Sequence, residues 1–388
     1  MCTVRSLLTT PVLWAGFTSL LAADSAVSGS QTDPTVERAS APASHPFPCL
    51  SGALTRDCRG REFDYFVSGN PAAPRPSKPG FGLLLMGGGG YVDAAYGELA
   101  QRAGRGHIVV LRATDDHSFD PEDGKLGPLF LGKWGQTVSC QTFTFHSRAA
   151  AFDSRVIAAL TNADGVFLAG GDQANYVHYW KGTPVQETLN HLVKRNRPIG
   201  GNSAGLAVLG HYSYVDVDGG SLESKDALAD PMARAVGLED DFLHFKALEN
   251  AITDTHFSAR SRLGRLIVFV ARLNNGQSSS RVYGIGVDER TAVLIDANGM
   301  GHLVAGSEGS AWVVTLGGAK WVVAPGQPLS AQNVAISQLT QTGVLHARSG
   351  MVDKPASVKE VSIQSRTVAA DEPLKSMMLR YHVPAGED

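Results

Sequence analysis

The sequence has no strong excess of charge of either sign. Among its 388 residues, 34 lysines and arginines stand against 37 aspartates and glutamates, which gives a net charge of −3. It also has no basic run interleaved with aromatic residues. These two absences remove the electrostatic reason to expect nucleic acid or an anionic membrane as a partner. Hydrophobic residues make up 43% of the chain, which argues against a disordered protein and allows a large core.

Beyond its first residues, the sequence has no run long and apolar enough to span a bilayer. At the start, Arg5 precedes a mostly apolar stretch at 7–21, and the small residues Ala22 and Ala23 follow. This layout predicts a signal peptide over residues 1–23, because the stretch is too short and too interrupted for a membrane anchor. We therefore expect a secreted or periplasmic protein that, once cleaved after Ala23, has no membrane contact.

Residues 24–61 are predicted to form a flexible leader, rich in Ser, Ala, Pro and Thr over its first half. It contains Cys49 and Cys58, nine positions apart, which in an exported protein are either joined in a disulfide or free. Cys140 is then unpaired, and we expect it to be a buried, inert thiol.

From residue 62 onward, short apolar runs alternate with segments of helical spacing. The runs are continuously apolar, which is typical of strands covered on both faces, as in a parallel sheet. The alternation predicts an α/β fold with a doubly wound, mostly parallel sheet over residues 62–300. The expected strands are 81–90, 107–113, 165–172, 197–205, 282–289 and 291–296, and the expected helices are 93–103, 147–162, 183–196 and 256–273. Residues 301–388 contain short β-prone pieces with glycine turns and predict a β-rich, antiparallel carboxyl-terminal extension.

Signatures of cofactor and metal binding are missing. The glycine run within residues 86–99 lies at a strand-to-helix junction, a position that suits phosphate. It has neither the G-x-G-x-x-G spacing nor the lysine of a P-loop. No two histidines show the helical spacing of metal ligands. We expect no cofactor and no metal.

Residues 201–205, GNSAG, fit the pattern G-x-S-x-G between a short apolar run and a helix-compatible run. A sharp turn from strand to helix lifts the serine hydroxyl above the sheet edge and aims backbone N–H groups at a developing oxyanion. The alternative is a plain glycine-rich loop, since the motif is short. The flanking segments favour Ser203 as a nucleophile.

A nucleophilic serine needs a base, and the base needs a group to orient it. His256 follows a short apolar stretch and starts the expected helix 256–273, which would place Arg260 on the same helix face. Glu289 ends an apolar run, at the carboxyl end of an expected strand, where open α/β sheets place their sites. Asp226 and Asp254 are alternatives for the orienting carboxylate.

Two further groups of residues are candidates for contacts with the substrate. Arg260, Arg262 and Arg265 either form a solvated face or hold a substrate carboxylate. The segment FLAGGDQ, residues 167–173, is either a plain turn or part of the site. In the second case, the backbone N–H groups of Gly171, Asp172 and Ala204 form an oxyanion hole, and Gln173 binds substrate.

Four segments, in the family's order, resemble the cyanophycinase branch of the S51 serine peptidases, relatives of aspartyl dipeptidase. The segments are FLAGGDQ, GGNSAGLAVLG, DTHFSARSRLGRL and GIGVDERTA, and the resemblance covers roughly residues 80–300. It implies a class I glutamine-amidotransferase-like α/β sandwich. The implied activity is hydrolysis of cyanophycin, a poly-aspartate backbone with arginine on each β-carboxylate, to β-aspartyl-arginine dipeptides.

The resemblance carries the nucleophile onto Ser203, the base onto His256 and the acid onto Glu289. The family's substrate contacts fall on Gln173, Asp254, Arg260, Arg262 and Arg265. In the dipeptidase relatives the acid lies between serine and histidine, which keeps Asp226 as an alternative.

The chain departs from the family at Asn202, where Thr is usual, and at Thr255, where Gln is usual. The alternatives are therefore an aspartyl or isoaspartyl dipeptidase and a non-catalytic binding protein on the same scaffold. The expected partner is a peptide substrate, either cyanophycin or β-aspartyl peptides, and a homodimer stays open.

Overall fold

The computed structural model describes residues 49–51, 55–115, 120–217, 220–275, 281–304, 309–364, 367–369, 374 and 377. All of them belong to one compact unit, Pro46–Asp388. The expected signal peptide and the leader as far as residue 48 lie outside the described residues. Within the described ranges, no helix combines the length and the apolar character needed to cross a membrane.

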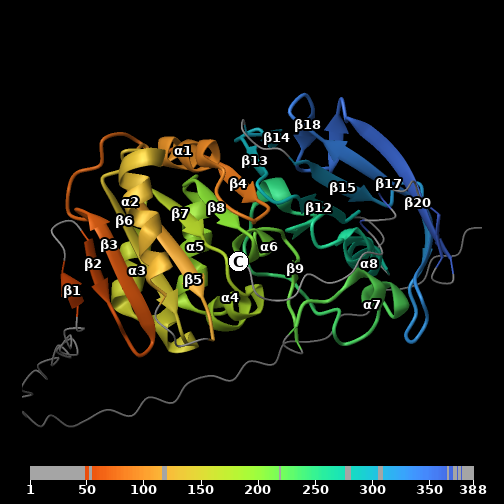
Figure 1. The fold of residues 1–388 in the computed structure, drawn as a ribbon, viewed down its shortest axis with the longest axis horizontal. Coiled ribbons are helices and arrows are strands. Elements are labelled where there is room, and N and C mark those ends of the chain that lie inside the picture. The colour runs from red at the N-terminus through yellow and green to blue at the C-terminus, as the bar shows by residue number, and fades with distance from the viewer. Residues whose placement is uncertain are drawn as a thin grey trace, which may run out of the picture. The chain divides into compact units, whose positions relative to one another are not determined.

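The larger of the two main sheets has twelve strands, and five parallel strands form its centre (Figure 1). In spatial order, the five are β6 (Ser139–Phe145), β5 (His107–Ala113), β7 (Gly165–Leu168), β8 (Ile199–Asn202) and β4 (Leu83–Met86). Every residue of β4 and β7 is buried, as expected for the continuous apolar runs that predicted them.

Antiparallel strands extend this centre on both sides. Beyond β6 lie β3 (Phe63–Gly69), β2 (Thr55–Cys58) and β1 (Cys49–Ser51). Beyond β4 lie β13 (Ala292–Ile295), β14 (Met300–Leu303), β18 (Val344–His346) and β19 (Met351–Asp353). Cys58 is disulfide-bonded, and the register of β1 and β2 sets Cys49 opposite it. Cys140 is a buried free thiol.

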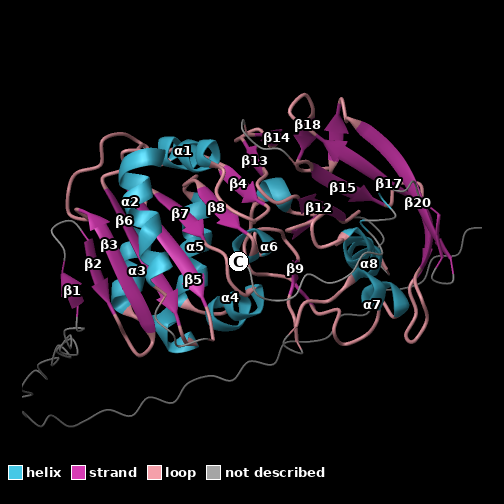
Figure 2. Ribbon diagram, viewed as in Figure 1, coloured by secondary structure: helices cyan, strands magenta, loops and turns pink. Residues whose placement is uncertain are grey.

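Helices cover both faces of the central strands (Figure 2). One layer contains α1 (Asp93–Arg102) and α2 (Leu126–Leu129), and the other contains α3 (Ser154–Thr161), α4 (Gln173–Trp180) and α5 (Pro184–Lys194). Successive residues of a strand point to opposite faces. Accordingly, Leu84 packs in one layer with Tyr96 of α1, and Leu85 in the other with Leu189 of α5.

The second sheet has seven strands and a helical cover of its own. Its strands are β11 (Ala251–Asp254), β12 (Tyr283–Val287), β15 (Ala311–Thr315), β17 (Ser330–Leu339), β20 (Ser357–Gln364), β21 (Thr367–Ala369) and β16 (Lys320–Val322), which pairs with β17. The helices α7 (Ser224–Ala229) and α8 (Leu263–Asn274) pack on it. Shorter elements are α6 (Ala204–Ala207), β9 (Ser213–Tyr214), β10 (Leu238–Glu239), η1 (Pro121–Lys125), η2 (Phe130–Trp134), η3 (Arg148–Phe152) and η4 (Lys246–Leu248).

The predicted α/β class with a β-rich extension is confirmed, but fewer of the expected strands belong to the parallel centre of the sheet. The expected strand at 282–289 corresponds to β12, which lies in the second sheet and not beside the central strands. The expected strand at 291–296 corresponds to β13, which runs antiparallel to β4. Strands from beyond residue 300 join both sheets, so the extension completes sheets that begin earlier in the chain.

Two expected helices differ from the structure. The helix expected at 147–162 is divided into η3 and α3 by Asp153, which has extended backbone and whose carboxylate accepts a hydrogen bond from the Arg155 N–H as the N-cap of α3. The helix expected at 256–273 starts only at Leu263, because turns occupy the residues after His256.

Candidate active site

Ser203 lies on the turn between β8 and α6 and has the unusual backbone angles φ 52° and ψ −120°. A positive φ is costly for a residue with a side chain, and such strain is found mainly at functional sites. Packing on both sides explains the two motif glycines. A Cβ on Gly201 would overlap the Gly205 backbone, and one on Gly205 would overlap the Leu168 carbonyl. The Ser203 N–H donates to the Met86 carbonyl at 3.1 Å, which fixes the turn at the carboxyl end of β4.

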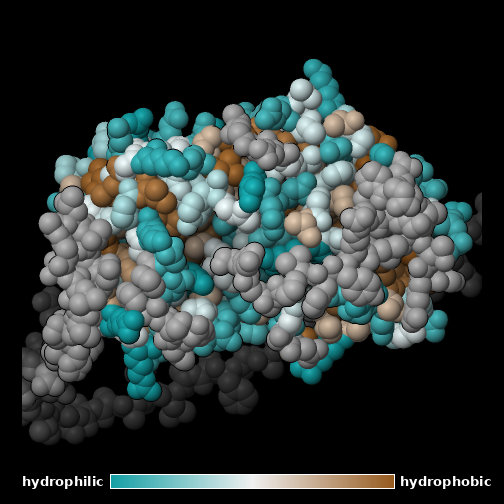
Figure 3. Space-filling view, in the orientation of Figure 1, coloured by the Kyte–Doolittle hydropathy of each residue, from teal (hydrophilic) through white to brown (hydrophobic). Residues whose placement is uncertain are grey.

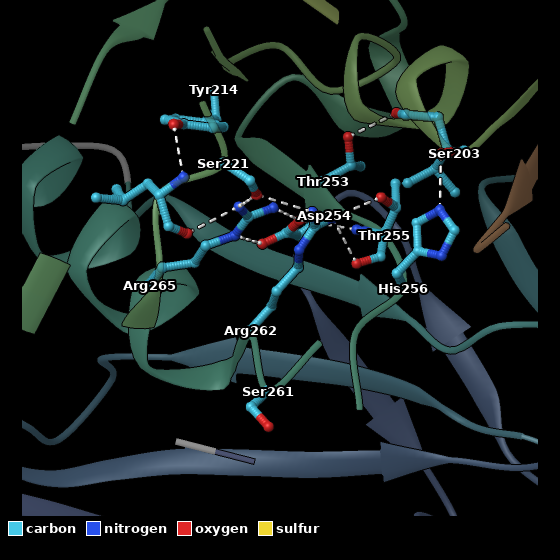
Figure 4. Close-up of polar contacts among 12 residues, drawn as sticks. Ser203, Tyr214, Ser221, Thr253, Asp254, Thr255, His256, Ser261, Arg262 and Arg265 are labelled. Carbon is cyan, nitrogen blue, oxygen red and sulfur yellow. Dashed lines mark hydrogen bonds and ion pairs between the residues drawn. The ribbon is translucent and has the colours of Figure 1, made fainter. Parts of the chain in front are cut away.

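His256 follows the carboxyl end of β11 and faces Ser203 (Figure 4). Its Nε2 lies 2.8 Å from Ser203 Oγ. Its backbone has φ 46°, and its N–H donates to the Gly87 carbonyl at 2.7 Å. The side chain is only 2% exposed. The histidine is therefore held rigidly beneath the glycine run.

Glu289 contacts the other nitrogen of the same ring. Its Oε1 lies 2.6 Å from His256 Nδ1, and about 35% of its side chain is exposed. Of the two alternatives, Asp226 is exposed on α7, and the Asp254 carboxylate is bonded to Arg265. Glu289 is thus the carboxylate that contacts the histidine, and we call Ser203, His256 and Glu289 the Ser–His–Glu triad.

Strand pairing brings the triad together. β11 and β12 are parallel neighbours with Asp254 opposite Gly286, so both strands end at the same edge. His256 and Glu289 follow those ends directly and come to lie side by side. Ser203 follows β8 of the larger sheet, so the triad lies where the two sheets meet.

The pKa of His256 is lowered from its ordinary value. Burial of the ring is the main cause, and the charges of Arg260 and Arg262 act in the same direction. The hydrogen bond to Glu289 opposes them. The ring is therefore neutral at pH 7. With its Nδ1–H donated to Glu289, Nε2 is free to accept the serine proton.

The residues predicted to supply an oxyanion hole belong to the loop after β7 and to the first turn of α6. A Cβ on Gly170 would be 3.6 Å from the Ser203 Cβ, so the loop after β7 passes close to the hydroxyl-bearing carbon. Gly171 and Asp172 are the next residues of that loop, and Asp172 caps α4 by accepting from the Ala174 N–H. Ala204 opens α6, and N–H groups in the first turn of a helix have no intrahelical acceptor.

Gln173, another predicted substrate contact, is the half-buried first residue of α4. It comes directly after the loop that passes Ser203. It therefore lies at the edge of the sheet where the candidate site is formed.

Two of the predicted substrate contacts are bonded to each other. Arg265 and Asp254 are each 2% exposed and form a two-point ion pair, Nε to Oδ2 at 2.8 Å and Nη2 to Oδ1 at 2.5 Å (Figure 4). Burial alone would raise the pKa of Asp254, but the charge and hydrogen bonds of Arg265 lower it. The Arg265 guanidinium also lies over the rings of Tyr214 and Phe269. Both groups are occupied internally, so the geometry gives their predicted contact with substrate no support.

Of the other two predicted arginines, Arg262 is buried and Arg260 is exposed. Arg262 donates to the Thr255 carbonyl and hydroxyl at 3.0 and 2.9 Å. Its Nη1 lies 3.5 Å from Asp254, which already pairs with Arg265, so two guanidinium groups share one carboxylate. Arg260 is exposed, and a turn brings its N–H to the His256 carbonyl at 2.9 Å, where the sequence predicted a helix.

The role of the glycine run 87–90 was not predicted from the sequence. A Cβ on Gly88 would overlap the His256 ring, and one on Gly89 would lie 2.7 Å from the Glu289 Cβ. The four consecutive glycines were the available signal, but they suggested a phosphate loop. In the structure they let the backbone lie directly over the triad. Within the described ranges, no three His, Cys, Asp or Glu residues are grouped to hold a metal ion.

The fold and site define an α/β protein in which a strained serine contacts a neutral, carboxylate-bound imidazole. Residues 136–301 match the model of peptidase family S51. The chain is 35% identical to the cyanophycinase of Trichormus variabilis over 147 residues, 38% of this chain and 44% of that protein. It is 32% identical to the cyanophycinase of Synechococcus elongatus over 153 residues, 39% of this chain and 42% of that protein.

The matched region, residues 136–301, contains Ser203, His256 and Glu289. The chain spans less than half the length of the curated relatives it matches. Among solved structures, a peptidase from an acI-B1 Actinobacterium aligns with 68% of this chain and 96% of its own, with a TM-score of 0.46 and 15% identity.

Proposed function

We propose that this protein is an exported serine-type peptidase that hydrolyses cyanophycin to β-aspartyl-arginine dipeptides. The observation that carries the proposal is the continuous series of contacts from Ser203 Oγ through His256 to Glu289, at 2.8 and 2.6 Å. The matched relatives are cyanophycinases, which supports the choice of substrate.

The proposed reaction proceeds through an acyl-enzyme on Ser203. His256 Nε2 takes the hydroxyl proton as Oγ attacks the carbonyl carbon of the scissile peptide bond. Glu289 keeps the Nδ1 proton in place and stabilises the imidazolium that forms. His256 then gives its proton to the leaving amine. Water, deprotonated by the same nitrogen, hydrolyses the ester and restores the serine.

The backbone N–H groups of Gly171, Asp172 and Ala204 are proposed to hold the oxyanion. They belong to the loop beside Ser203 and to the first turn after it. Groups fixed in this way need no reorganisation when charge develops on the carbonyl oxygen. Gln173, which directly follows the same loop, is proposed to bind substrate.

The charges around the triad fit a substrate that carries both signs. The charges of Arg260 and Arg262 both act on His256, and Arg260 is exposed. These cations favour a substrate carboxylate. At the loop beside Ser203, burial raises the pKa of Asp172, and the charges of Asp216 and Asp115 raise it further. This acidic group of residues favours the substrate guanidinium.

An aspartyl or isoaspartyl dipeptide is the alternative substrate. Asn202, next to the nucleophile, has a side-chain oxygen that is buried and has no hydrogen-bond partner among the described residues. It stands where threonine is usual in the family that the sequence resembles. Thr255, the second departure, accepts a hydrogen bond from Arg262. Both residues lie next to the reacting groups, so they bear on which peptide fits.

The experiment is incubation of the purified protein with insoluble cyanophycin and, separately, with β-aspartyl dipeptides, followed by mass analysis of the products. The proposal expects β-aspartyl-arginine from cyanophycin, and no product from Ser203→Ala, which stays folded. Cleavage of dipeptides alone would favour the alternative. No product from either substrate would favour a non-catalytic binding protein. A homodimer is proposed only as the assembly to test, by analytical ultracentrifugation.

A further inference from the structure

Asp288, the residue before Glu289, has a carboxylate that accepts hydrogen bonds from two distant segments. Its Oδ1 accepts from the backbone N–H and the hydroxyl of Ser258, at 3.0 and 2.5 Å. Its Oδ2 accepts from the Ser310 N–H at 3.0 Å and from the Trp312 indole Nε1 at 3.1 Å. Four donors thus converge on one side chain, which the reaction proposed above does not use.

These donors come from two segments that are far apart in the chain. Ser258 lies two residues after His256, in the turn that precedes α8. Ser310 directly precedes β15 and Trp312 lies within it, so both belong to the carboxyl-terminal extension. The Asp288 N–H also donates to the Ser310 carbonyl at 3.1 Å. Asp288 therefore connects the turn after His256, the turn that contains Glu289 and the carboxyl-terminal extension.

We infer that Asp288 is a positioning residue for the triad and that it makes β15 part of the active-site scaffold. The contact between His256 Nδ1 and Glu289 Oε1 depends on two separate turns, and both contain a residue other than glycine with positive φ, His256 and Arg290. Strained turns persist only when surrounding bonds hold them. Asp288 supplies such bonds to one turn while belonging to the other. The inference rests on the proposed role of the triad.

The substitution Asp288→Asn tests this role, because an amide retains the shape of the side chain but can accept at only one of its two ends. Its nitrogen would face the donors of either Ser258 or Trp312. Asp296→Asn is the matched control. Asp296 also accepts from backbone N–H groups, those of Asn298 and Met300, but it lies in the turn between β13 and β14.

Two measurements report on the triad itself. The first is the rate at which a fluorophosphonate labels Ser203, as a function of pH. The second is the proton NMR signal of the His256 Nδ1–H bonded to Glu289. Because a displacement of about 1 Å costs on the order of a hundredfold in rate, we expect Asp288→Asn to label at least about tenfold more slowly, with a shifted or lost NMR signal. Asp296→Asn should match the unmodified protein in both.

Trp312→Phe and Ser258→Ala each remove a single donor and keep the inference testable if Asp288→Asn does not fold. Each should slow labelling by a few fold, and circular dichroism should show that the variants are folded. The inference would be overturned if folded Asp288→Asn had the same labelling rate, pH profile and NMR signal as the unmodified protein. The same result in both single-donor variants would overturn it as well.

Failure of the proposed function has a different signature. If the unmodified protein is not labelled at all, the nucleophilic role of Ser203 is wrong. The His256 proton signal still tests Asp288 in that case, because it depends on geometry and not on reaction. Its persistence in Asp288→Asn would then overturn the inference.

Discussion

Among single residues, His256 connects the other two members of the triad. Its ring is 2% exposed and contacts Ser203 through one nitrogen and Glu289 through the other. Burial lowers its pKa, and a neutral ring is the form that accepts a proton. The neighbouring carboxylate fixes which nitrogen carries the hydrogen.

Replacing Glu289 by Gln should lower the turnover of cyanophycin by roughly 10²- to 10⁴-fold, because an amide favours the wrong orientation of the imidazole and does not stabilise the imidazolium. The measurement is the initial rate of dipeptide release. Glu239→Gln is the matched control, since the Glu239 side chain forms an exposed ion pair with Lys181. Equal rates in the Glu289 variant and its control would exclude Glu289 as the orienting acid.

The pH dependence of phosphonate labelling should follow the lowered pKa of His256. Labelling needs the neutral ring, so it is lost as pH falls through that pKa, at lower pH than for an ordinary histidine. The charge of Arg260 contributes to the lowering. Arg260→Gln should therefore raise the pKa and move the loss to higher pH. Arg281→Gln, at the opposite end of β12 from Glu289, should leave the pH profile unchanged. Equal shifts in the Arg260 and Arg281 variants would contradict a specific effect of Arg260 on His256.

The local sequence pattern indicates which residues follow the strands, but it does not indicate which charged residues become buried. Ser203, His256 and Glu289 each follow an apolar strand, which is visible in the sequence, but it is not visible there that β8 belongs to one sheet and β11 and β12 to the other. The resemblance to the S51 family implied that Arg265 and Asp254 contact substrate, whereas their mutual burial depends on how α8 packs against β11.

At the scale of elements, the glycine run between β4 and α1 shapes the site through the absence of side chains. Gly88 has φ 97° and faces the His256 ring. The run has its own bonds to the site, because Gly87 and Gly88 carbonyls accept from the His256 and Arg290 N–H groups. A backbone segment therefore occupies a position that no side chain fits.

Gly88→Ala should abolish labelling of Ser203, with a rate loss of about a hundredfold or more, because the added methyl group displaces the imidazole. The positive φ adds strain. Labelling rate and thermal unfolding together separate a displaced histidine from an unfolded protein. Gly132→Ala is the control, since a Cβ there meets no atom within 4 Å. Normal labelling in Gly88→Ala would show that the run does not constrain His256.

The buried pair of Asp254 and Arg265 links the end of β11 to α8. Arg265→Met should lower the free energy of unfolding by about 3–5 kcal/mol, because the buried Asp254 carboxylate would lose its two-point partner and keep only Arg262, whose Nη1 lies 3.5 Å away. Urea denaturation measures the change. Arg155→Met, which breaks an exposed pair with Asp153, should cost about 1 kcal/mol or less. A small effect at Arg265 would mean that water or another group compensates the carboxylate.

Helix starts and strand partners were the elements predicted least well. The helical spacing after His256 is real, but a residue with positive φ cannot continue a helix, so α8 begins seven residues later. Apolar runs likewise predicted the strands β12 and β13 but not their partners. The sequence of a buried strand is an apolar run whichever sheet it joins. Its partner and the direction of pairing depend on segments elsewhere in the chain.

At the scale of the whole molecule, the two sheets meet at the triad, and the carboxyl-terminal strands belong to both sheets. The face shown in Figure 3 is largely hydrophilic, with hydrophobic residues in small groups. The exposed large hydrophobic side chains come from different segments and include Tyr91, Phe152, Val322 and Val358. The function is therefore inferred from the triad and not from a binding surface.

Reaction with a fluorophosphonate, followed by peptide mass spectrometry, identifies the nucleophile of the site. We expect one adduct per chain, on Ser203, together with loss of cyanophycin hydrolysis, and no adduct in His256→Ala. Hydrolysis that continues in fully labelled protein, or an adduct on another residue with Ser203 unmodified, would contradict this expectation.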